Sequence, residues 1–290
     1  MPKLFGQFRF HLAHDSSVLV ERASRACQVA KDRVGRVDAI VLPECATRAG
    51  EATLISEATG ALVIAGVGGE FDGHDVNRVE FAAPYEDVTA EYSQGKHHRW
   101  KLDRSQIVQY GLAEQLDPER VWWESFEIER RELYFTAIAE ATTLAVMICE
   151  DLARPDPAAE IIRAVGPSLV IALLLDGPQL LTRWPARYAT VLEQDPGSSV
   201  LSLTSLGMAR LSRRPDQSAS RVVALWKDGR SGPAKELLLP HGACGLLLNL
   251  GCEWVKEFSA DGRHDKYAGT NGARGTTPYL VYQGCHAIEV

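Results

Sequence analysis

The sequence lacks the features that mark membrane proteins and nucleic-acid-binding proteins. None of its apolar runs approaches the ~18 consecutive residues that a membrane-spanning helix needs, and the amino-terminal segment has no signal-peptide pattern. The 31 Lys and Arg residues are outnumbered by 38 Asp and Glu residues, which gives a net charge of −7. A negatively charged surface does not attract nucleic acid or anionic lipid. We therefore expect a cytoplasmic protein that binds neither nucleic acid nor a membrane.

Metal-binding, disulfide and nucleotide-binding patterns are also missing. The six cysteines show no C-x-x-C spacing, which argues against a zinc site and a disulfide framework. The glycine-rich stretch GVGG at 66–69 has no G-x-G-x-x-G register and no helix pattern after it, so we expect a tight turn there. His97 and His98 are adjacent, so on a strand they would face opposite sides and could not share one metal ion. We interpret them as a surface pair at a strand end.

What the sequence does contain is typical of one α/β domain. Its 290 residues are enough for a single large core, and 46% hydrophobic with 24% charged residues is ordinary for a globular chain. Short apolar runs that read as strands alternate with segments that have helical spacing. From these patterns alone we expect an α/β fold with a mixed sheet.

Cys149 follows one of these apolar runs directly. The five residues LAVMI at 144–148 favour a buried strand, and Glu150 and Asp151 come immediately after the cysteine. Sites in α/β sheets form at the carboxyl ends of strands, where loops on a rigid scaffold open into a crevice. Cys149 is therefore placed to act as a nucleophile. The alternative is that it is a small core hydrophobe, as most free cysteines are.

Two other stretches carry residues that could activate a thiol. The run DAIVLPE at 38–44 is an apolar strand that ends on Glu44, because Pro43 cannot continue a strand ladder. The segment EYSQGKHHRW at 91–100 presents Lys96 after a glycine. A carboxylate can accept the proton of a thiol, and an ammonium group stabilises the negative charge that develops.

Taken in the order VLPE, KHH and ICED, these stretches resemble the Glu-Lys-Cys triad of the nitrilase (carbon–nitrogen hydrolase) superfamily, in its amidase-like branch. The resemblance implies that residues 1–290 form one such domain, a nitrilase-like four-layer αββα sandwich with mixed sheets. It also implies catalysis without a metal or cofactor and a homodimer or larger homo-oligomer. The substrate would be a small linear amide or nitrile. An amide is favoured because Glu150 and Asp151 follow Cys149, where true nitrilases have a Trp-Glu pair.

The resemblance assigns further roles around the triad. Glu44 would act as general base and acid, while Lys96 and the backbone N–H of Glu150 would hold the oxyanion. Lys101 is the rival to Lys96. A second glutamate is expected in the irregular loop that we predict between Lys101 and Trp123, with Glu114 as the first candidate and Glu119 as its substitute. Asp176, after the apolar run that ends at Leu175, is expected to line the substrate pocket.

Two other functions compete with the hydrolase hypothesis. A nitrilase-like domain can serve as a regulatory or interaction module of a larger assembly, for example an ammonia-supplying glutaminase domain or the partner of a synthetase or a defence protein. An intact triad argues against a purely structural role. A class I glutamine amidotransferase would need a glycine-flanked elbow around the cysteine. Ile148 and Glu150 flank Cys149 instead, which excludes that class.

Overall fold

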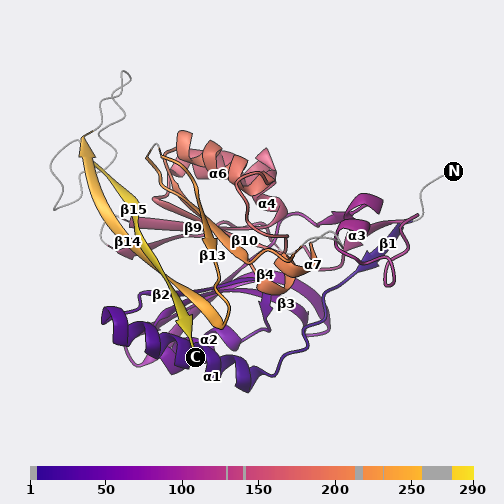
Figure 1. The fold of residues 1–290 in the computed structure, drawn as a ribbon, viewed down its shortest axis with the longest axis horizontal. Coiled ribbons are helices and arrows are strands. Elements are labelled where there is room, and N and C mark those ends of the chain that lie inside the picture. The colour runs from indigo at the N-terminus through magenta and orange to yellow at the C-terminus, as the bar shows by residue number, and fades with distance from the viewer. Residues whose placement is uncertain (1–4, 129, 140–141, 213–217, 231, 257–275) are drawn as a thin grey trace.

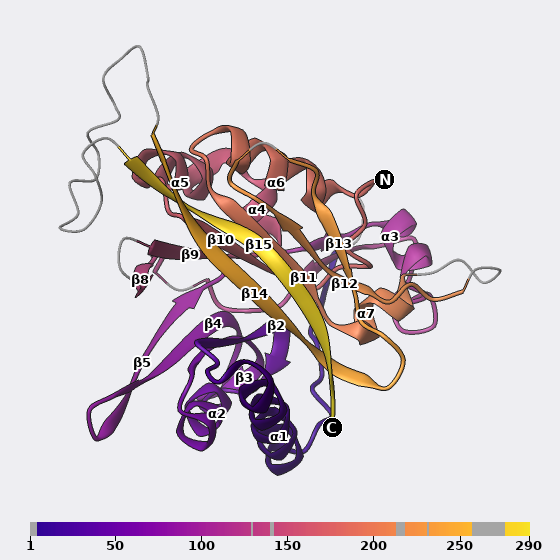
Figure 2. The ribbon, with the colours of Figure 1, turned by 60° about the vertical axis from the view of Figure 1, so that its left-hand side comes forward.

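Two β-sheets packed face to face between helices form the body of the protein (Figure 1). The computed structural model describes residues 5–128, 130–139, 142–212, 218–230, 232–256 and 276–290. Viewed from a second direction, the layers follow one another as helices, sheet, sheet and helices (Figure 2). This is the four-layer αββα arrangement with mixed sheets that the resemblance to the nitrilase superfamily implied, and that prediction is confirmed.

The amino-terminal half contributes a four-stranded sheet and the helices on its outer face. The sheet order is β2 (Ala39–Thr47), β3 (Leu62–Phe71), β4 (His74–Tyr85) and β5 (Val88–Gly95). Only β2 and β3 run parallel; the other pairs are antiparallel. The helices α1 (Ser16–Val34) and α2 (Glu51–Thr59) cover it, because α2 buries Ala52 and Ile55 against strand residues such as Val63.

The carboxyl-terminal half contributes a six-stranded sheet. Its strands in spatial order are β13 (Lys235–Leu238), β12 (Val222–Lys227), β11 (Ser199–Thr204), β10 (Leu169–Leu174), β9 (Thr142–Ile148) and β8 (Phe135–Ala139). The central strands β9, β10 and β11 are parallel. All six residues of β10 are buried, as expected for a continuous apolar strand that is covered on both faces.

Helices close the outer face of this second sheet, and the inner face meets the first sheet. On the outside lie α4 (Glu150–Ala153), α5 (Glu160–Val165) and α6 (Trp184–Gln194), with α4 against β9 and α6 against β11 and β12. Inside, Ile64, Val79 and Phe81 of the first sheet join one core cluster with the strands of the second. This largely apolar interface packs the two sheets against each other.

Smaller elements surround the sandwich. Residues 101–123, which we predicted to be an irregular loop, instead contain β6 (Lys101–Leu102), α3 (Arg104–Gln109) and the first part of β7 (Val121–Glu124). The strands β6 and β7 form a small sheet with β1 (Phe5–Phe8). A helix, α7 (Leu206–Leu211), follows β11. The long hairpin of β14 (Ala243–Lys256) and β15 (Thr276–Glu289) crosses the molecule, with β15 contacting both α1 and β11 (Figure 2).

None of the helices in the described ranges is long and apolar enough to cross a membrane.

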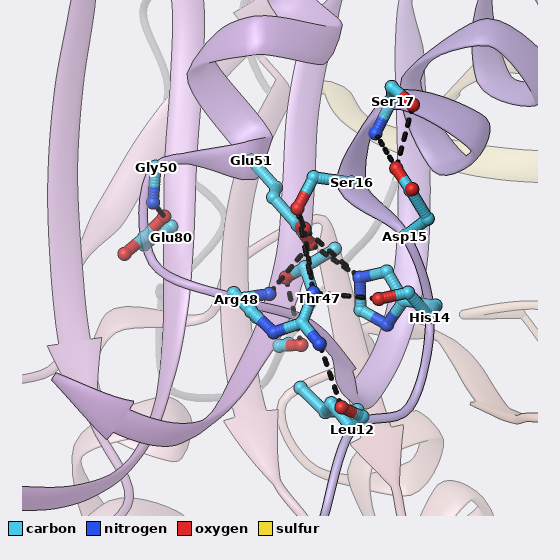
Figure 3. Close-up of polar contacts among 11 residues, drawn as sticks. Leu12, His14, Asp15, Ser16, Ser17, Thr47, Arg48, Gly50, Glu51 and Glu80 are labelled. Carbon is cyan, nitrogen blue, oxygen red and sulfur yellow. Dashed lines mark hydrogen bonds and ion pairs between the residues drawn. The ribbon is translucent and has the colours of Figure 1, made fainter.

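A polar cluster holds the chain where it leaves β2 (Figure 3). The guanidinium of Arg48 donates to the backbone oxygens of Leu12 (2.7 Å) and His14 (2.8 Å). The Glu51 carboxylate accepts from the backbone N–H of Arg48 (2.7 Å), accepts from the Ser16 hydroxyl and lies 2.9 Å from Nε2 of His14. These contacts tie the end of β2, and with it Glu44, to the start of α1.

We predict that Glu51→Gln lowers the free energy of unfolding by about 2 kcal/mol at neutral pH, since it weakens hydrogen bonds to a buried charge. Although burial raises the pKa of Glu51, the hydrogen bonds from Ser16 and Arg48 outweigh it and leave the pKa below the ordinary 4.5. A lowered carboxyl pKa contributes stability above the unfolded pKa that is lost as the pH falls through the folded pKa. The deficit should therefore shrink below pH 4.5.

Denaturant unfolding across this pH range measures the effect. Glu57→Gln, at an exposed position of the same helix, is the matched control. A constant deficit from neutral to acidic pH would contradict a role for the Glu51 charge.

Candidate active site

Glu44 lies in a break of the strand ladder. The pairing of β2 with β3 runs from Ala39 to Leu42 and resumes only at Thr47, which is where we expected Pro43 to interrupt it. A Cβ on Gly66 of β3 would lie 2.4 Å from the Cα of Glu44, so only glycine allows this close approach. The stretch GVGG at 66–69 is therefore part of β3 and not the tight turn that we predicted, because it makes room for the Glu44 segment.

Lys96 follows β5 and points its ammonium group into the interior. Its backbone N–H donates to the Asn77 carbonyl at 2.9 Å. The Nζ atom lies 2.7 Å from Oε1 of Glu44 and 2.7 Å from Oε2 of Glu124. Glu44 and Lys96 are 1% and 2% exposed, so these ion pairs are shielded from water and salt. Lys101, the rival lysine, is exposed on β6 and lies over the Trp123 ring.

The second carboxylate beside Lys96 is Glu124 and not Glu114, which corrects our prediction. Glu114 is exposed in a turn, and Glu119, the substitute, is exposed and paired with Arg104. Glu124 is fixed by the backbone N–H of Trp100 at 2.9 Å. The sequence carried a signal that we missed, because VWWE at 121–124 is an apolar run ending on a carboxylate, as is the run before Glu44.

Asn77 of β4 bridges the two carboxylates. Its Nδ2 atom donates to Oε1 of Glu44 at 2.7 Å and to Oε1 of Glu124 at 2.6 Å. One oxygen of Glu44 is thus held by both Asn77 and Lys96, while Oε2 is buried and has no hydrogen-bond partner among the described residues. A carboxylate held in this way keeps one oxygen free to take a proton.

Cys149 ends β9 in a strained conformation. Its φ is +46°, a region that non-glycine residues avoid at a cost of about 1–3 kcal/mol. Its backbone N–H donates to Leu173 on the neighbouring strand at 2.9 Å. The thiol is 5% exposed, and Glu44 and Lys96 both act on it electrostatically. The three residues of the predicted triad therefore come together at one place.

The loop after Cys149 is tied to the loop that carries Lys96. Both carboxylate oxygens of Asp151 accept from the backbone N–H of His97, at 3.0 and 3.2 Å, and Oδ1 lies 2.9 Å from Nδ1 of His98. His97 is buried, so the two histidines are not the surface pair that we predicted. Within the described ranges, no group of three or more His, Cys, Asp or Glu residues is placed to hold a metal ion.

Burial and neighbouring charges shift the pKa values of the triad. Burial raises the pKa of Cys149 well above 9.0, and the Glu44 carboxylate adds to this while Lys96 opposes it. Burial also raises the pKa of Glu44 above 4.5, against the opposing effect of Lys96. For Lys96, burial lowers the pKa, but Glu124 and Glu44 outweigh it and hold the pKa well above 10.5. The resting site thus combines a neutral thiol, a strong carboxylate base and a permanent cation.

The two other predicted site residues flank Cys149 in different ways. The Glu150 side chain is directed at Arg154, with Oε2 3.3 Å from its Nε, and only the backbone of Glu150 stays beside the thiol, at the start of α4. Asp176 is buried just beyond the end of β10, the strand that pairs with β9. It accepts from the Tyr110 hydroxyl and from Arg183 at 2.6 Å.

Comparison with solved structures returns carbon–nitrogen hydrolases. Nit3 of Saccharomyces cerevisiae, a member of branch 10 of the nitrilase superfamily, is 14% identical with a TM-score of 0.49, over 79% of this chain and 80% of Nit3. A CN-hydrolase superfamily protein of Xanthomonas campestris is 13% identical with a TM-score of 0.43, over 70% and 74%. A carbon–nitrogen hydrolase of Helicobacter pylori G27 is 12% identical with a TM-score of 0.43, over 69% and 72%.

These structures come from the superfamily that the sequence resembles. No family model matches the sequence, and no curated protein matches it. At these identities the comparison concerns the arrangement of the chain alone. The chemistry of the site therefore rests on its own geometry, and the amidase-like branch stays a prediction.

We predict that Glu124→Gln destabilises the protein by about 3 kcal/mol, because it breaks one of the two buried ion pairs of Lys96. Glu114→Gln should change the free energy of unfolding by less than about 0.5 kcal/mol, as is usual at exposed positions. Denaturant unfolding of both variants measures the difference. Equal effects of the two substitutions would contradict the assignment of Glu124 as the second carboxylate.

Proposed function

We propose that the protein hydrolyses a non-peptide carbon–nitrogen bond, that of a small linear amide, through a thioester formed on Cys149. The observation that carries the proposal is the buried contact of Lys96 with Glu44 and Glu124 beside the strained Cys149. The two ion pairs and the thiol lie together at the break in β2 and at the ends of β5, β7 and β9. Stability alone does not require these polar groups, since an apolar cluster of equal volume is often as stable as a buried ion pair.

The first half-reaction begins with a proton transfer. Glu44 takes the thiol proton on its free oxygen, Oε2, as the sulfur attacks the amide carbon and a carbon–sulfur bond forms. The carbonyl oxygen becomes an oxyanion, which Lys96 and the backbone N–H of Glu150 stabilise. A preorganised donor of this kind lowers a barrier by about 3 kcal/mol in a water-excluded site. The carbon–nitrogen bond then breaks, and protonated Glu44 delivers its proton to the leaving nitrogen.

The second half-reaction restores the free enzyme. Glu44, ionised again, takes a proton from water as the water oxygen attacks the thioester carbon. Collapse of this second oxyanion breaks the carbon–sulfur bond, releases a carboxylic acid and returns the proton to Cys149. Lys96 keeps its proton in both halves, in line with a pKa raised well above 10.5 by Glu124 and Glu44.

The regulatory alternative has one observation in its favour. Cys149, Glu44 and Lys96 are each at most 5% exposed, so a substrate reaches the thiol only when part of the surrounding structure moves. A module that gains activity only on docking to a partner would have such a closed site. The reactivity of Cys149 in the isolated protein distinguishes the two functions.

The test of the proposal is intact-mass spectrometry after incubation with a panel of small amides, nitriles and glutamine, combined with an ammonia assay. We expect a covalent adduct and ammonia release that both disappear in Cys149→Ala, because only the thiol can form the acyl-enzyme. Glu44→Gln and Lys96→Ala should lower turnover by at least about a thousandfold, since each removes the proton acceptor or an oxyanion donor. Thermal unfolding of each variant controls for loss of the fold.

Two outcomes would count against the hydrolase. Full activity of any one triad variant would remove that residue from the mechanism. An absence of adducts, together with a Cys149 that is inert to a small alkylating agent, would favour the regulatory module.

The pH dependence of kcat/KM follows from the shifted pKa values. Glu44 must be ionised to accept a proton, and because its pKa is raised, the inactive protonated form persists to a pH above the ordinary 4.5. We therefore expect kcat/KM to fall on the acidic side with a midpoint above that value. Loss of the Lys96 proton should not lower activity until the pH exceeds 10.5. An acidic midpoint at or below 4.5 would contradict Glu44 as the base.

A further inference from the structure

Asp176 lies beside the nucleophile because two parallel strands end together. Leu173 of β10 pairs with Ile148 of β9, so the residues after both strands emerge at the same edge of the sheet. The negative charge of Asp176, which follows Leu175 at this edge, is one of the causes that raise the pKa of Cys149, after burial and Glu44. The Thr204 hydroxyl donates to the Asp176 carbonyl at 2.6 Å, which fixes the backbone of this turn against β11.

One oxygen of Asp176 is fully engaged, and the other has no partner. Oδ1 accepts from the Tyr110 hydroxyl and from a guanidinium nitrogen of Arg183 at 2.6 Å. Oδ2 is buried and has no hydrogen-bond partner among the described residues, and the Asp176 side chain as a whole is only 7% exposed. Buried carboxylate oxygens are almost always hydrogen-bonded, so an unpartnered one beside a nucleophile requires an explanation.

The charges around Cys149 do not cancel. Three carboxylates, those of Glu44, Glu124 and Asp176, face two cations, Lys96 and Arg183. The guanidinium of Arg183 is held by Asp176 and packs against Gly177. A Cβ at position 177 would lie 3.0 Å from Nη1 of Arg183. Arg183 therefore acts as the support of Asp176. Two buried atoms of this ion pair have no hydrogen-bond partner among the described residues: the donor Nε of Arg183 and the acceptor Oδ2 of Asp176. Of these two, Oδ2 belongs to the negatively charged group, which favours a hydrogen-bond donor with positive charge.

We propose that Oδ2 of Asp176 binds a protonated amine of the substrate, so that the enzyme prefers amides that carry an ammonium group close to the scissile carbonyl. This inference rests on the proposed function and adds the substrate class to it. Asp176 selects by charge in a water-excluded site, where a salt bridge discriminates more strongly than at the surface. The hydroxyl of Tyr110 and the guanidinium of Arg183 both bind Oδ1, which leaves Oδ2 as the oxygen available to a ligand.

Thiol labelling with reagents of different charge tests the inference without a known substrate. The probes are 2-aminoethyl, methyl and 2-sulfonatoethyl methanethiosulfonate, which are cationic, neutral and anionic. The Cys149 sulfur attacks the sulfenyl sulfur of the reagent, so a disulfide to the alkylthio group forms, the S–SO2 bond breaks, and methanesulfinate and the thiol proton are released. Rates at Cys149 are followed by peptide mapping, because Cys244 and Cys252 are exposed free cysteines that react as well. To correct for the intrinsic reactivity of each reagent, its labelling rate at Cys149 is divided by its rate of reaction with 2-mercaptoethanol.

We expect the cationic reagent to label Cys149 about tenfold faster than the neutral one on this relative scale, and the anionic reagent to be slowest. Asp176→Asn should bring the cationic and neutral rates together while Cys149 stays reactive. Asp87→Asn, in the exposed turn between β4 and β5, changes the net charge equally and should keep the preference.

If Asp176→Asn does not fold, the relative labelling rates of Cys149 in the wild-type protein are enough to overturn the inference. Labelling of Cys149 without a cationic preference would reject the ammonium subsite and leave the hydrolase standing. A preference that survives in folded Asp176→Asn would reject Asp176 as its source. A Cys149 that none of the three reagents labels would reject the subsite and the proposed hydrolase together.

Discussion

The ammonium group of Lys96, held between Glu44 and Glu124 in the interior, is the interaction on which the site depends. A buried charge is tolerated only when opposite charges and hydrogen bonds surround it, and removing one partner is strongly destabilising. The two carboxylates therefore have to arrive within 2.7 Å of Nζ. This requirement fixes where the ends of β2, β5 and β7 meet, and Asn77 of β4 locks the carboxylates together.

Backbone geometry, more than side-chain packing, makes that meeting possible. The break in the ladder between Leu42 and Thr47 turns Glu44 out of the strand and toward the second sheet. The glycines of β3 allow it, because a side chain on Gly66 would collide with the backbone of Glu44. Cys45, in the break of β2, and Cys149, just after β9, both adopt positive φ angles. Strain of this kind persists only when a rigid surrounding structure over-determines it, and the packed sheets provide that structure.

The sequence predicted the parts of the site that follow from local patterns. Glu44 and Cys149 each end an apolar run, and Lys96 follows a glycine at a strand end. Each pattern is weak alone, and the three residues were singled out because together they resemble the triad of the nitrilase superfamily. Glu124 was missed because the segment before it looked irregular, although the apolar run of Val121, Trp122 and Trp123 ends on this carboxylate. Asn77 could not be predicted for a different reason. It lies inside β4, and its role arises only from contacts with Glu44 and Glu124, which are 33 and 47 residues away in the chain.

Burial decides how such a site could work. A surface thiol beside a lysine becomes a thiolate because its pKa falls, but here burial and Glu44 raise the pKa of Cys149, and burial also raises that of Glu44. A thiolate formed in advance would be costly, so the mechanism that we propose moves the proton to Glu44 as the carbon–sulfur bond forms. In that mechanism the oxyanion replaces, next to Lys96, the negative charge that Glu44 loses on protonation. In such a site the same low dielectric that suppresses the free thiolate strengthens every interaction with the transition state.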